Sequence, residues 1–511
     1  MHIKLCFLVA VVCAFAVTSL HAQNIVYSEP DRNDTRGLNF EIIGKMNNHY
    51  LIYKSVRNND NHISIYDNDM KLVTNEKLSF LPDRIINSDI LAYKNFFYFF
   101  YQYQHRNVVY CMAARLDADA KLVGEPQTLD TTQINFLANN KVYSYVVSED
   151  KQKVGFIKIN TKNENSYFVT SLIYDDSLTQ LSKSYMSVDM PERNDFLTEF
   201  NIDNDGDIVF VRAAGGSQKD NIVSLTLFSK RMNNNLPRVY ELPLNKIFLD
   251  DVRVKVDNYN KNYLVTSFYT KARRGNVDGL FASLYSKTSD SLLATTFTTF
   301  SEDLRNSVKS NGNPRFAFND FFLQNIVMRK DGGYVIAAES VYSSTRGNQF
   351  NRWDYFNSYP FFYPSSAYYY YSYSSPFNYY YPWSRGGYGL QNTRYFADNI
   401  ALLSFDSTGN MNWSNVIHKS QYDDNTDDFI GYTTMNTGSE VHFLYNETVR
   451  KNVLLSDQTI TPDGELNHTP TLHNLDRGYE FMPRLGKQVG AKQMIIPCSY
   501  RNYICFAKVD F

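Results

Sequence analysis

The sequence predicts an all-β protein built as a single β-propeller. Short runs of β-branched and aromatic residues recur along the chain, and Asn, Asp and Gly separate them. These runs repeat with a period of about 50 residues, which is typical of propeller blades. The chain holds 40 Tyr and 36 Phe, and both residue types favour strands, whereas Asn and Asp favour turns. A small four-stranded sheet buries both faces only by stacking on its neighbours, as the blades of a ring do.

The first element, residues 1–22, is predicted to be a secretory signal. It has a basic start at Lys4, an apolar run over residues 5–17 and Ala22 before Gln23. That run is too short to span a bilayer and ends at a signal-peptidase-like site. We therefore expect the mature chain, residues 23–511, outside the cytoplasm, in the periplasm or at the cell surface, with outer-membrane association as an option. No later segment approaches the roughly 18 apolar residues of a membrane-spanning helix, so such association would be peripheral.

The blade elements follow in order. A first type of strand occurs at residues 49–53, 96–101, 207–211, 262–267 and 333–337. A second strand usually follows and ends on a polar marker, and these markers are Asp67, Asp117, Asp175, Ser229, Ser286 and Asp406. The long step between Ser286 and Asp406 predicts one repeat plus an insertion. A blurred copy at 453–461 and a last copy at 507–510 give eight blades; seven blades and two β-sandwich domains are the alternatives.

The ends of the chain predict how the ring closes. The eighth copy stops at Phe511, directly after its third strand. Residues 24–27 precede the first full copy and are β-branched and aromatic, so we expect them to supply the missing fourth strand. Pairing of the two ends would remove the exposed sheet edges that invite aggregation.

One turn carries a resemblance to known repeats. Residues 404–413, with Asp406, Gly409 and Trp413, resemble the Asp-x-x-Gly-x-x-x-Trp turn of quinoprotein-type propeller repeats, and more loosely the Asp-box of sialidases. Residues 461–466 look like a second, degraded instance. The resemblance implies the β-propeller superfamily and no specific family within it, and it carries no catalytic implication.

The insertion, residues 343–397, falls between the second and third strands of blade six. Half of residues 353–388 are aromatic, and a composition of Tyr with Ser and Gly suits protein recognition. Sugar stacking, a lipid headgroup boundary, a lid on the propeller's own surface and a low-complexity tract are the other interpretations. The candidate partner-binding residues are Trp353, Tyr355, Phe356, Tyr359, Phe361, Phe362, Tyr363, Tyr369, Tyr371, Tyr380 and Trp383.

Two cysteines near the C-terminus are spaced as a cross-strand pair. A two-residue turn at residues 501–502 would place Cys498 directly opposite Cys505, and an exported protein can form a disulfide there. Two free thiols packed in adjacent strands are the alternative. Cys111 is expected to be a buried strand residue.

The sequence shows no recognisable catalytic motif, so no catalytic residue, metal ligand or cofactor is assigned. Residues 201–207 resemble the start of a calcium loop, but Arg212 occupies the twelfth position, where a bidentate Glu is needed. An ordinary hairpin turn is therefore the preferred interpretation. The formal net charge of −2 gives no electrostatic reason to expect nucleic-acid binding.

These observations favour a non-enzymatic, exported scaffold or recognition subunit of a cell-envelope protein complex. Its protein partners would bind the propeller face and the aromatic insertion. The alternative function is a carbohydrate-binding or carbohydrate-active propeller, with a glycan as the ligand.

Overall fold

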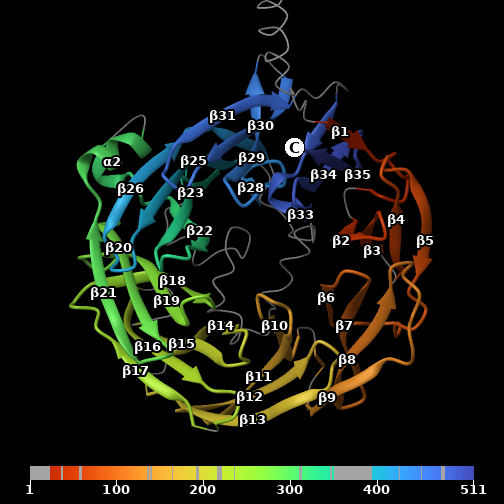
Figure 1. The fold of residues 1–511 in the computed structure, drawn as a ribbon, viewed down its shortest axis with the longest axis horizontal. Helices are drawn as coiled ribbons and strands as arrows, with labels where there is room; N and C mark the ends of the chain where they lie inside the picture. The colour runs from red at the N-terminus through yellow and green to blue at the C-terminus, as the bar shows by residue number, and fades with distance from the viewer. Residues whose placement is uncertain are drawn as a thin grey trace, which may run out of the picture.

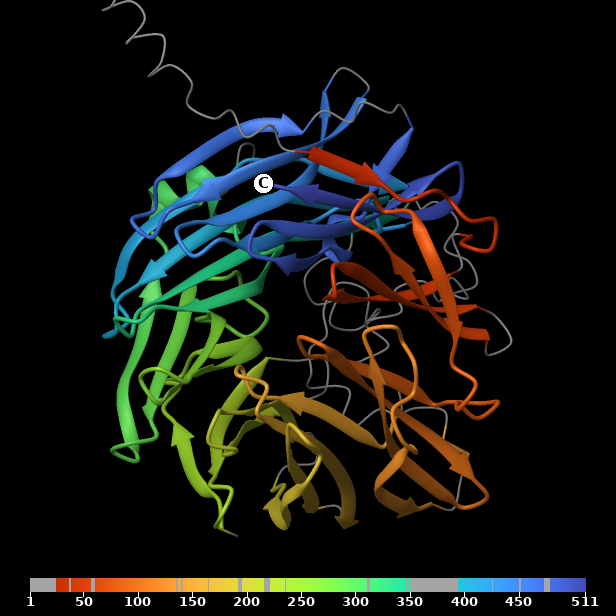
Figure 2. The same cartoon turned by 45° about the vertical axis from the view of Figure 1, so that its right-hand side comes forward.

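The computed structural model of the chain confirms an all-β propeller, in which antiparallel sheets follow one another around a ring (Figures 1 and 2). The structure describes residues 24–511 except for residues 36–37, 57–59, 135–136, 139–140, 164, 192–194, 216–220, 235, 310–312, 346–347, 350–393, 425, 450–451 and 473–477.

In the first half of the chain, each blade is an antiparallel meander whose strands run outward in sequence order. The first blade has β2 (Asn39–Met46), β3 (His49–Val56), β4 (Asp60–Tyr66) and β5 (Leu72–Lys77). The second has β6 (Asn87–Ala92), β7 (Phe96–His105), β8 (Val108–Asp117) and β9 (Gln127–Gln133). The third has β10 (Tyr143–Val147), β11 (Lys153–Asn163), β12 (Ser166–Asp175) and β13 (Gln180–Asp189). The next group has β14 (Phe196–Ile202), β15 (Ile208–Gly215), β16 (Ile222–Lys230) and β17 (Arg238–Leu242).

The second half repeats this plan with additions. The fifth group has β18 (Phe248–Asp257), β19 (Asn262–Thr270), β20 (Gly279–Ser286) and β21 (Ser291–Thr299). After α2 (Glu302–Val308) and η1 (Pro314–Phe316), the blade that we call the insertion blade has β22 (Phe321–Met328), β23 (Tyr334–Thr345), β24 (Asn348–Gln349), β25 (Arg394–Phe405), β26 (Met411–Ile417) and β27 (Gln421–Asp424). The next blade has β28 (Tyr432–Asn436), β29 (Val441–Val449), β30 (Asn452–Ile460) and β31 (Leu466–Leu472).

The last blade, here the closing blade, joins the two ends of the described chain. It has β32 (Tyr479–Phe481), η3 (Pro483–Leu485), β33 (Lys487–Gly490), β34 (Gln493–Tyr500), β35 (Tyr503–Asp510) and β1 (Asn24–Tyr27). β1 pairs antiparallel with β35, with Asn24 opposite Asp510, so red and blue strands meet in Figure 1. The predicted closure by an N-terminal strand is confirmed.

Hydrogen bonding divides the described strands into seven sheets. The one eight-stranded sheet consists of two successive four-stranded groups, which are joined where Ile222 of β16 pairs with Leu249 of β18. Each group otherwise has the order of a blade. Because this pairing joins the two groups into one sheet, the count of eight blades stays a prediction.

Four of the six polar markers are Asp residues that accept hydrogen bonds in the turns of their hairpins, whereas Ser229 lies within β16 and Ser286 ends β20. The Asp67 carboxylate accepts hydrogen bonds from the backbone N–H of Asp69 and of Lys71, each at 2.9 Å. Asp117, Asp175 and Asp406 make the same pair of bonds in their own hairpins. A short carboxylate can satisfy two backbone donors in a tight turn, which explains why Asp recurs at this place in the repeat.

The tryptophan of the quinoprotein-like turn packs against the next blade. The Trp413 indole N–H donates to the Pro462 carbonyl oxygen at 3.3 Å, and its ring covers Gly464. A Cβ at Gly464, whose φ is +88°, would lie 2.6 Å from that ring. The position therefore requires glycine for both space and backbone conformation. Repeat-motif residues thus link neighbouring blades here.

The hydrophobic core lies between blades. One buried cluster combines Leu51 and Tyr53 of the first blade with Phe97 and Phe99 of the second. Another joins the first blade to the closing blade, for example through Phe40 and Phe506, whose rings are 5.2 Å apart. The ring is therefore packed across its closure as it is elsewhere. Within the described part of the chain, no helix has the length and apolar character needed to cross a membrane.

Candidate functional site

The candidate functional site is the base of the aromatic insertion, because the predicted partner-binding residues themselves, from Trp353 to Trp383, lie outside the described residues. The flanking strands are described. β23 runs to Thr345 and β25 begins at Arg394, and Ser344 pairs with Arg394. The central hairpin of this blade is thus longer than the sequence predicts, since we expected its strands to end near residue 342 and to resume near 399.

Three aromatic rings form a continuous group on β23, β25 and the adjoining β27. The rings of Tyr342 and Phe396 are stacked, with centroids 4.5 Å apart, and Phe396 lies 6.4 Å from Tyr422 of β27. The Tyr342 hydroxyl donates to the Asp398 carboxylate at 2.9 Å. Tyr422 is 62 % exposed. Aromatic side chains therefore continue from the insertion sequence onto β23, β25 and β27.

An ion pair holds the exposed ring in place. The Arg394 guanidinium lies 4.5 Å from the Tyr422 ring centroid and binds the Asp424 carboxylate through two contacts of 2.7 and 3.1 Å. This pairing lowers the pKa of Asp424 below its ordinary value. A two-point contact of this kind fixes orientation as well as distance. We call Arg394, Phe396, Tyr422 and Asp424 the rim platform.

A buried ionic network lies beneath the rim platform. The Glu339 carboxylate of β23, fully buried, contacts the Lys419 ammonium at 2.8 Å and the Arg484 guanidinium at 3.1 Å. Lys419 also donates to the Ala397 carbonyl oxygen and to the Gln421 side-chain oxygen, both at 2.8 Å. Burial lowers the pKa of Lys419, against the opposing effect of Glu339. The network connects β23 to the start of β25, to β27 and to the closing blade.

Two carboxyl groups beside this network have pKa values near neutrality. Burial, with the negative charge of Asp428, raises the pKa of Asp423 to about 7. Burial also raises the pKa of Asp427 to about 6, although Arg484, 3.5 Å away, opposes the shift. No group of three or more described His, Cys, Asp or Glu residues is arranged to hold a metal ion.

The raised pKa of Asp423 predicts a pH-dependent stability of β27. The folded-state pKa of about 7 exceeds the ordinary 3.8, so the folded state binds the proton more tightly. Protonated Asp423 therefore stabilises the folded state fully below pH 3.8, and this contribution to stability is lost as the pH rises through about 7. Asp423→Asn should therefore slow amide exchange in β27, relative to the unmodified chain, at pH 7 and not below pH 3.8.

The neighbouring Asp424 gives a matched control for this measurement. Its pKa is lowered by Arg394, so Asp424→Asn should not slow exchange at pH 7. Equal effects of the two substitutions would contradict the assignment to Asp423.

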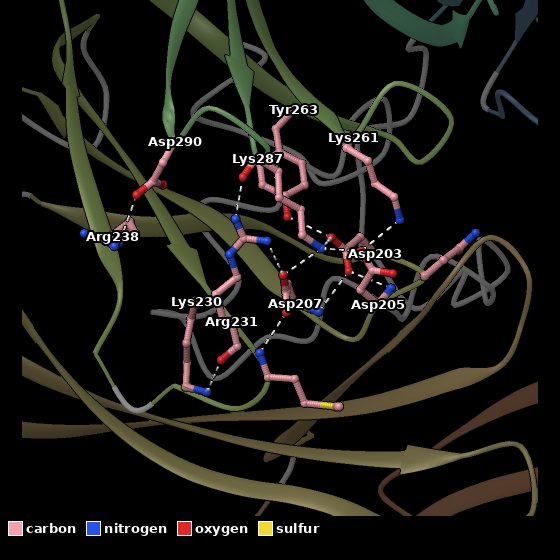
Figure 3. Close-up of polar contacts among 12 residues, drawn as sticks. Asp203, Asp205, Asp207, Lys230, Arg231, Arg238, Lys261, Tyr263, Lys287 and Asp290 are labelled. Atoms are coloured by element: carbon pink, nitrogen blue, oxygen red, sulfur yellow. Dashed lines mark hydrogen bonds and ion pairs between the residues drawn. The ribbon is translucent and has the colours of Figure 1, made fainter.

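The loop that resembles a calcium site contains a lysine ammonium among its carboxylates. Asp203 accepts from the backbone N–H of Asp205 at 3.0 Å and of Asp207 at 2.9 Å, as a hairpin turn does. The Lys287 ammonium lies 2.5, 2.7 and 2.6 Å from the carboxylates of Asp203, Asp205 and Asp207 (Figure 3). The charge that a cation would supply is therefore supplied by the chain itself.

Further partners complete this cluster, which we call the Lys287 cluster. Tyr263 donates to Asp203 at 2.9 Å, and Arg231 contacts Asp207 at 3.1 Å. Hydrogen bonds from Lys261 and Lys287 lower the pKa of Asp205 to about 2. The residues come from two successive blade groups (Figure 3), so we interpret the cluster as a connection between blades.

Cys498 and Cys505 face each other in the closing blade. The register of β34 and β35 places them opposite each other, as the two-residue turn predicts, and their sulfur atoms are 3.2 Å apart. The two sulfur atoms are not bonded to each other in this structure, and the disulfide stays a prediction. Cys111 is buried in β8.

Sequence reasoning missed the network around Glu339. Its members come from three separated segments, at residues 339, 419–427 and 484. The one local signal is Glu339, a charged residue within the apolar strand that starts at Tyr334. A carboxylate in such a strand indicates a buried cationic partner, because an unpaired carboxylate is rarely fully buried.

Comparison with known proteins found distant structural likenesses and no match in sequence. No protein-family model matches the chain, and no curated protein does. Similar solved structures include the WD40 domain of SCAP from fission yeast, with 9 % identity, a TM-score of 0.38 and coverage of 96 % of this chain and 98 % of that one. The BP39L lectin from Burkholderia pseudomallei shows 8 % identity, a TM-score of 0.36 and coverage of 86 % and 99 %. A PL25 ulvan lyase shows 8 % identity, a TM-score of 0.34 and coverage of 82 % and 90 %. Likenesses this distant transfer no activity to this chain.

Proposed function

We propose that this chain is an exported, non-enzymatic recognition subunit of a cell-envelope protein complex, which binds a protein partner at the insertion blade. The rim platform carries this proposal. Tyr and Arg dominate the binding energy of many protein interfaces, and here an exposed Tyr422 is held by Arg394 and Asp424 on ordered strands. A side chain that is already oriented loses less entropy when a partner binds.

The predicted aromatic insertion strengthens this proposal. In the sequence, its undescribed residues follow β24 and end just before Arg394, which belongs to the rim platform. A surface that joined the platform to so many Tyr and Phe side chains would have the composition of a protein-recognition site. The buried network around Glu339 would keep its base rigid.

The test is affinity purification of the native protein, followed by identification of the chains that accompany it. Tyr422→Ala should reduce the amount of the co-purifying partner at least tenfold, since an anchoring tyrosine contributes about 2 kcal/mol or more. Deletion of residues 350–393 should abolish co-purification.

Tyr185 provides the matched control, because it is also 62 % exposed and lies on β13 of the third blade. Tyr185→Ala should leave the partner bound. If the protein purifies alone, or if both tyrosine variants behave like the unmodified chain, the proposed recognition at the rim platform is wrong.

A carbohydrate is the second candidate ligand. The observation in its favour is that Tyr422 lies beside both a guanidinium and a carboxylate, and sugar recognition uses an aromatic face next to hydrogen-bonding groups. Binding of soluble glycans that is lost in Tyr422→Ala and kept in Tyr185→Ala would favour this function over protein recognition.

A further inference from the structure

We propose that Cys498 and Cys505 form a disulfide bond across the closing blade, and that the bond forms before this blade packs into the ring. The compartment in which the bond forms follows from the proposed function, because only an exported chain reaches an oxidising environment. The two residues are opposite each other in the register of β34 and β35, with sulfur atoms 3.2 Å apart.

The hairpin fixes this pairing locally. Tyr500 pairs with Tyr503, and the two turn residues between them, Arg501 and Asn502, have φ values of 48° and 71°. Two positive φ values are the signature of the tight turn that matches the twist of a hairpin. Eight residue pairs of β34 and β35 then hold the register. Bond formation needs the sulfur atoms to approach to about 2.0 Å, which the facing side chains can do without a change of register.

Burial determines when the bond can form. Both cysteines are fully buried, within a cluster that includes Met435 and Leu444 of the preceding blade. Burial raises the pKa of the Cys498 thiol well above its ordinary value, and only a thiolate attacks a disulfide. The packed blade therefore protects its thiols from oxidants. The reactive stage is the exposed hairpin, before the neighbouring blade covers it.

The bond forms by exchange with a disulfide oxidant, either a protein disulfide or a small one such as oxidised glutathione. One cysteine, as thiolate, attacks the oxidant and gives a mixed disulfide, and the first oxidant thiol leaves. The second cysteine displaces the other oxidant thiol and completes the Cys498–Cys505 bond. Two electrons reduce the oxidant, and the two cysteine protons end on its thiols.

Cys111 serves as an internal reference. It is also buried, but its partners in register are Gln102 of β7 and Asp130 of β9. No cysteine faces it across either strand pair, so it should stay a thiol under the same conditions.

The first experiment uses the native full chain, denatured and alkylated without a reductant. Trypsin cleaves after Arg501, which lies between the two cysteines, so a bridged pair yields two peptides linked by sulfur. We expect this linked species, its separation on reduction, and, among the three cysteines of residues 23–511, alkylation of Cys111 alone. Alkylated Cys498 and Cys505 in protein that fractionates outside the cytoplasm would overturn the disulfide and leave the proposed function standing. Fractionation into the cytoplasm would overturn the exported function instead.

A second experiment tests the timing and needs no export. Reduced protein is treated with oxidised glutathione either folded or during refolding from denaturant. The linked peptides should form at least tenfold faster during refolding, and Cys111→Ser should not alter this. Equal rates would overturn the timing, whereas the absence of linked peptides in both samples would overturn the pairing.

Discussion

Lys287→Met is expected to lower the free energy of unfolding by about 3–5 kcal/mol, the range for a buried charge group that loses one partner. The Lys287 side chain is 5 % exposed, and Asp203 and Asp207 are 4 % and 7 % exposed. Methionine removes the ammonium and leaves these carboxylates close together in a medium that solvates them poorly. Arg231 remains beside Asp207, so part of the positive charge that balances the carboxylates is kept. Urea unfolding followed by tyrosine fluorescence measures the change.

Lys261→Met is the matched control, since Lys261 binds Asp205 of the same cluster at 2.8 Å but is 42 % exposed. An exposed pair contributes about 1 kcal/mol or less. If the two variants lose similar stability, the Lys287 ammonium is not the compensating charge that the geometry indicates.

Lys419→Met is expected to cost about 3 kcal/mol or more, by the same reasoning. It leaves the fully buried Glu339 carboxylate with Arg484 as its remaining cationic contact, and it removes the hydrogen bonds that the Ala397 carbonyl and the Gln421 side-chain oxygen accept from the ammonium. Because these groups connect β23, β25 and β27, amide exchange should accelerate most in these strands. Hydrogen exchange with mass spectrometry resolves the strands, and urea unfolding gives the global change.

A double variant separates charge from packing. Glu339→Gln combined with Lys419→Met removes both charges, and it should be more stable than Lys419→Met alone, because the buried carboxylate that Lys419→Met leaves with Arg484 alone is gone. Lys77→Met, at an exposed lysine 3.8 Å from Asp60, should change stability by less than about 1 kcal/mol. A double variant no better than the single one would show that packing, and not charge, causes the loss.

The fold could be predicted because its signals are local. Four of the repeats carry an Asp marker such as Asp67 or Asp406, whose carboxylate accepts hydrogen bonds from two amides of its own turn. The closure of the ring by β1 could be predicted because the last copy of the repeat lacked its fourth strand. The extension of β23 and β25 could not, since Ser343 and Ser344 interrupt the apolar pattern there.

The charged networks could not be predicted, because the ring brings their members together. Asp203 and Lys287 belong to different blade groups, and Glu339 meets Lys419 and Arg484 from two later segments. The sequence showed a polar loop at residues 201–207 and suggested either a turn or a calcium site. The positive charge that compensates the carboxylates of this loop is Lys287, and no local sequence pattern connects this lysine to the loop.

The pairing of β1 with β35 also bears on how the protein is made. The first described strand finds its partner only in the last one, so this contact has nearly the greatest sequence separation that the chain allows. Contacts of this kind form late and slowly. A chain delivered N-terminus first must therefore keep β1 unattached while every other blade emerges, and its last hairpin exposes a free edge until β1 docks. The interval between synthesis and docking is when the protein is most exposed to aggregation, and a chaperone that held either strand would set the rate of maturation.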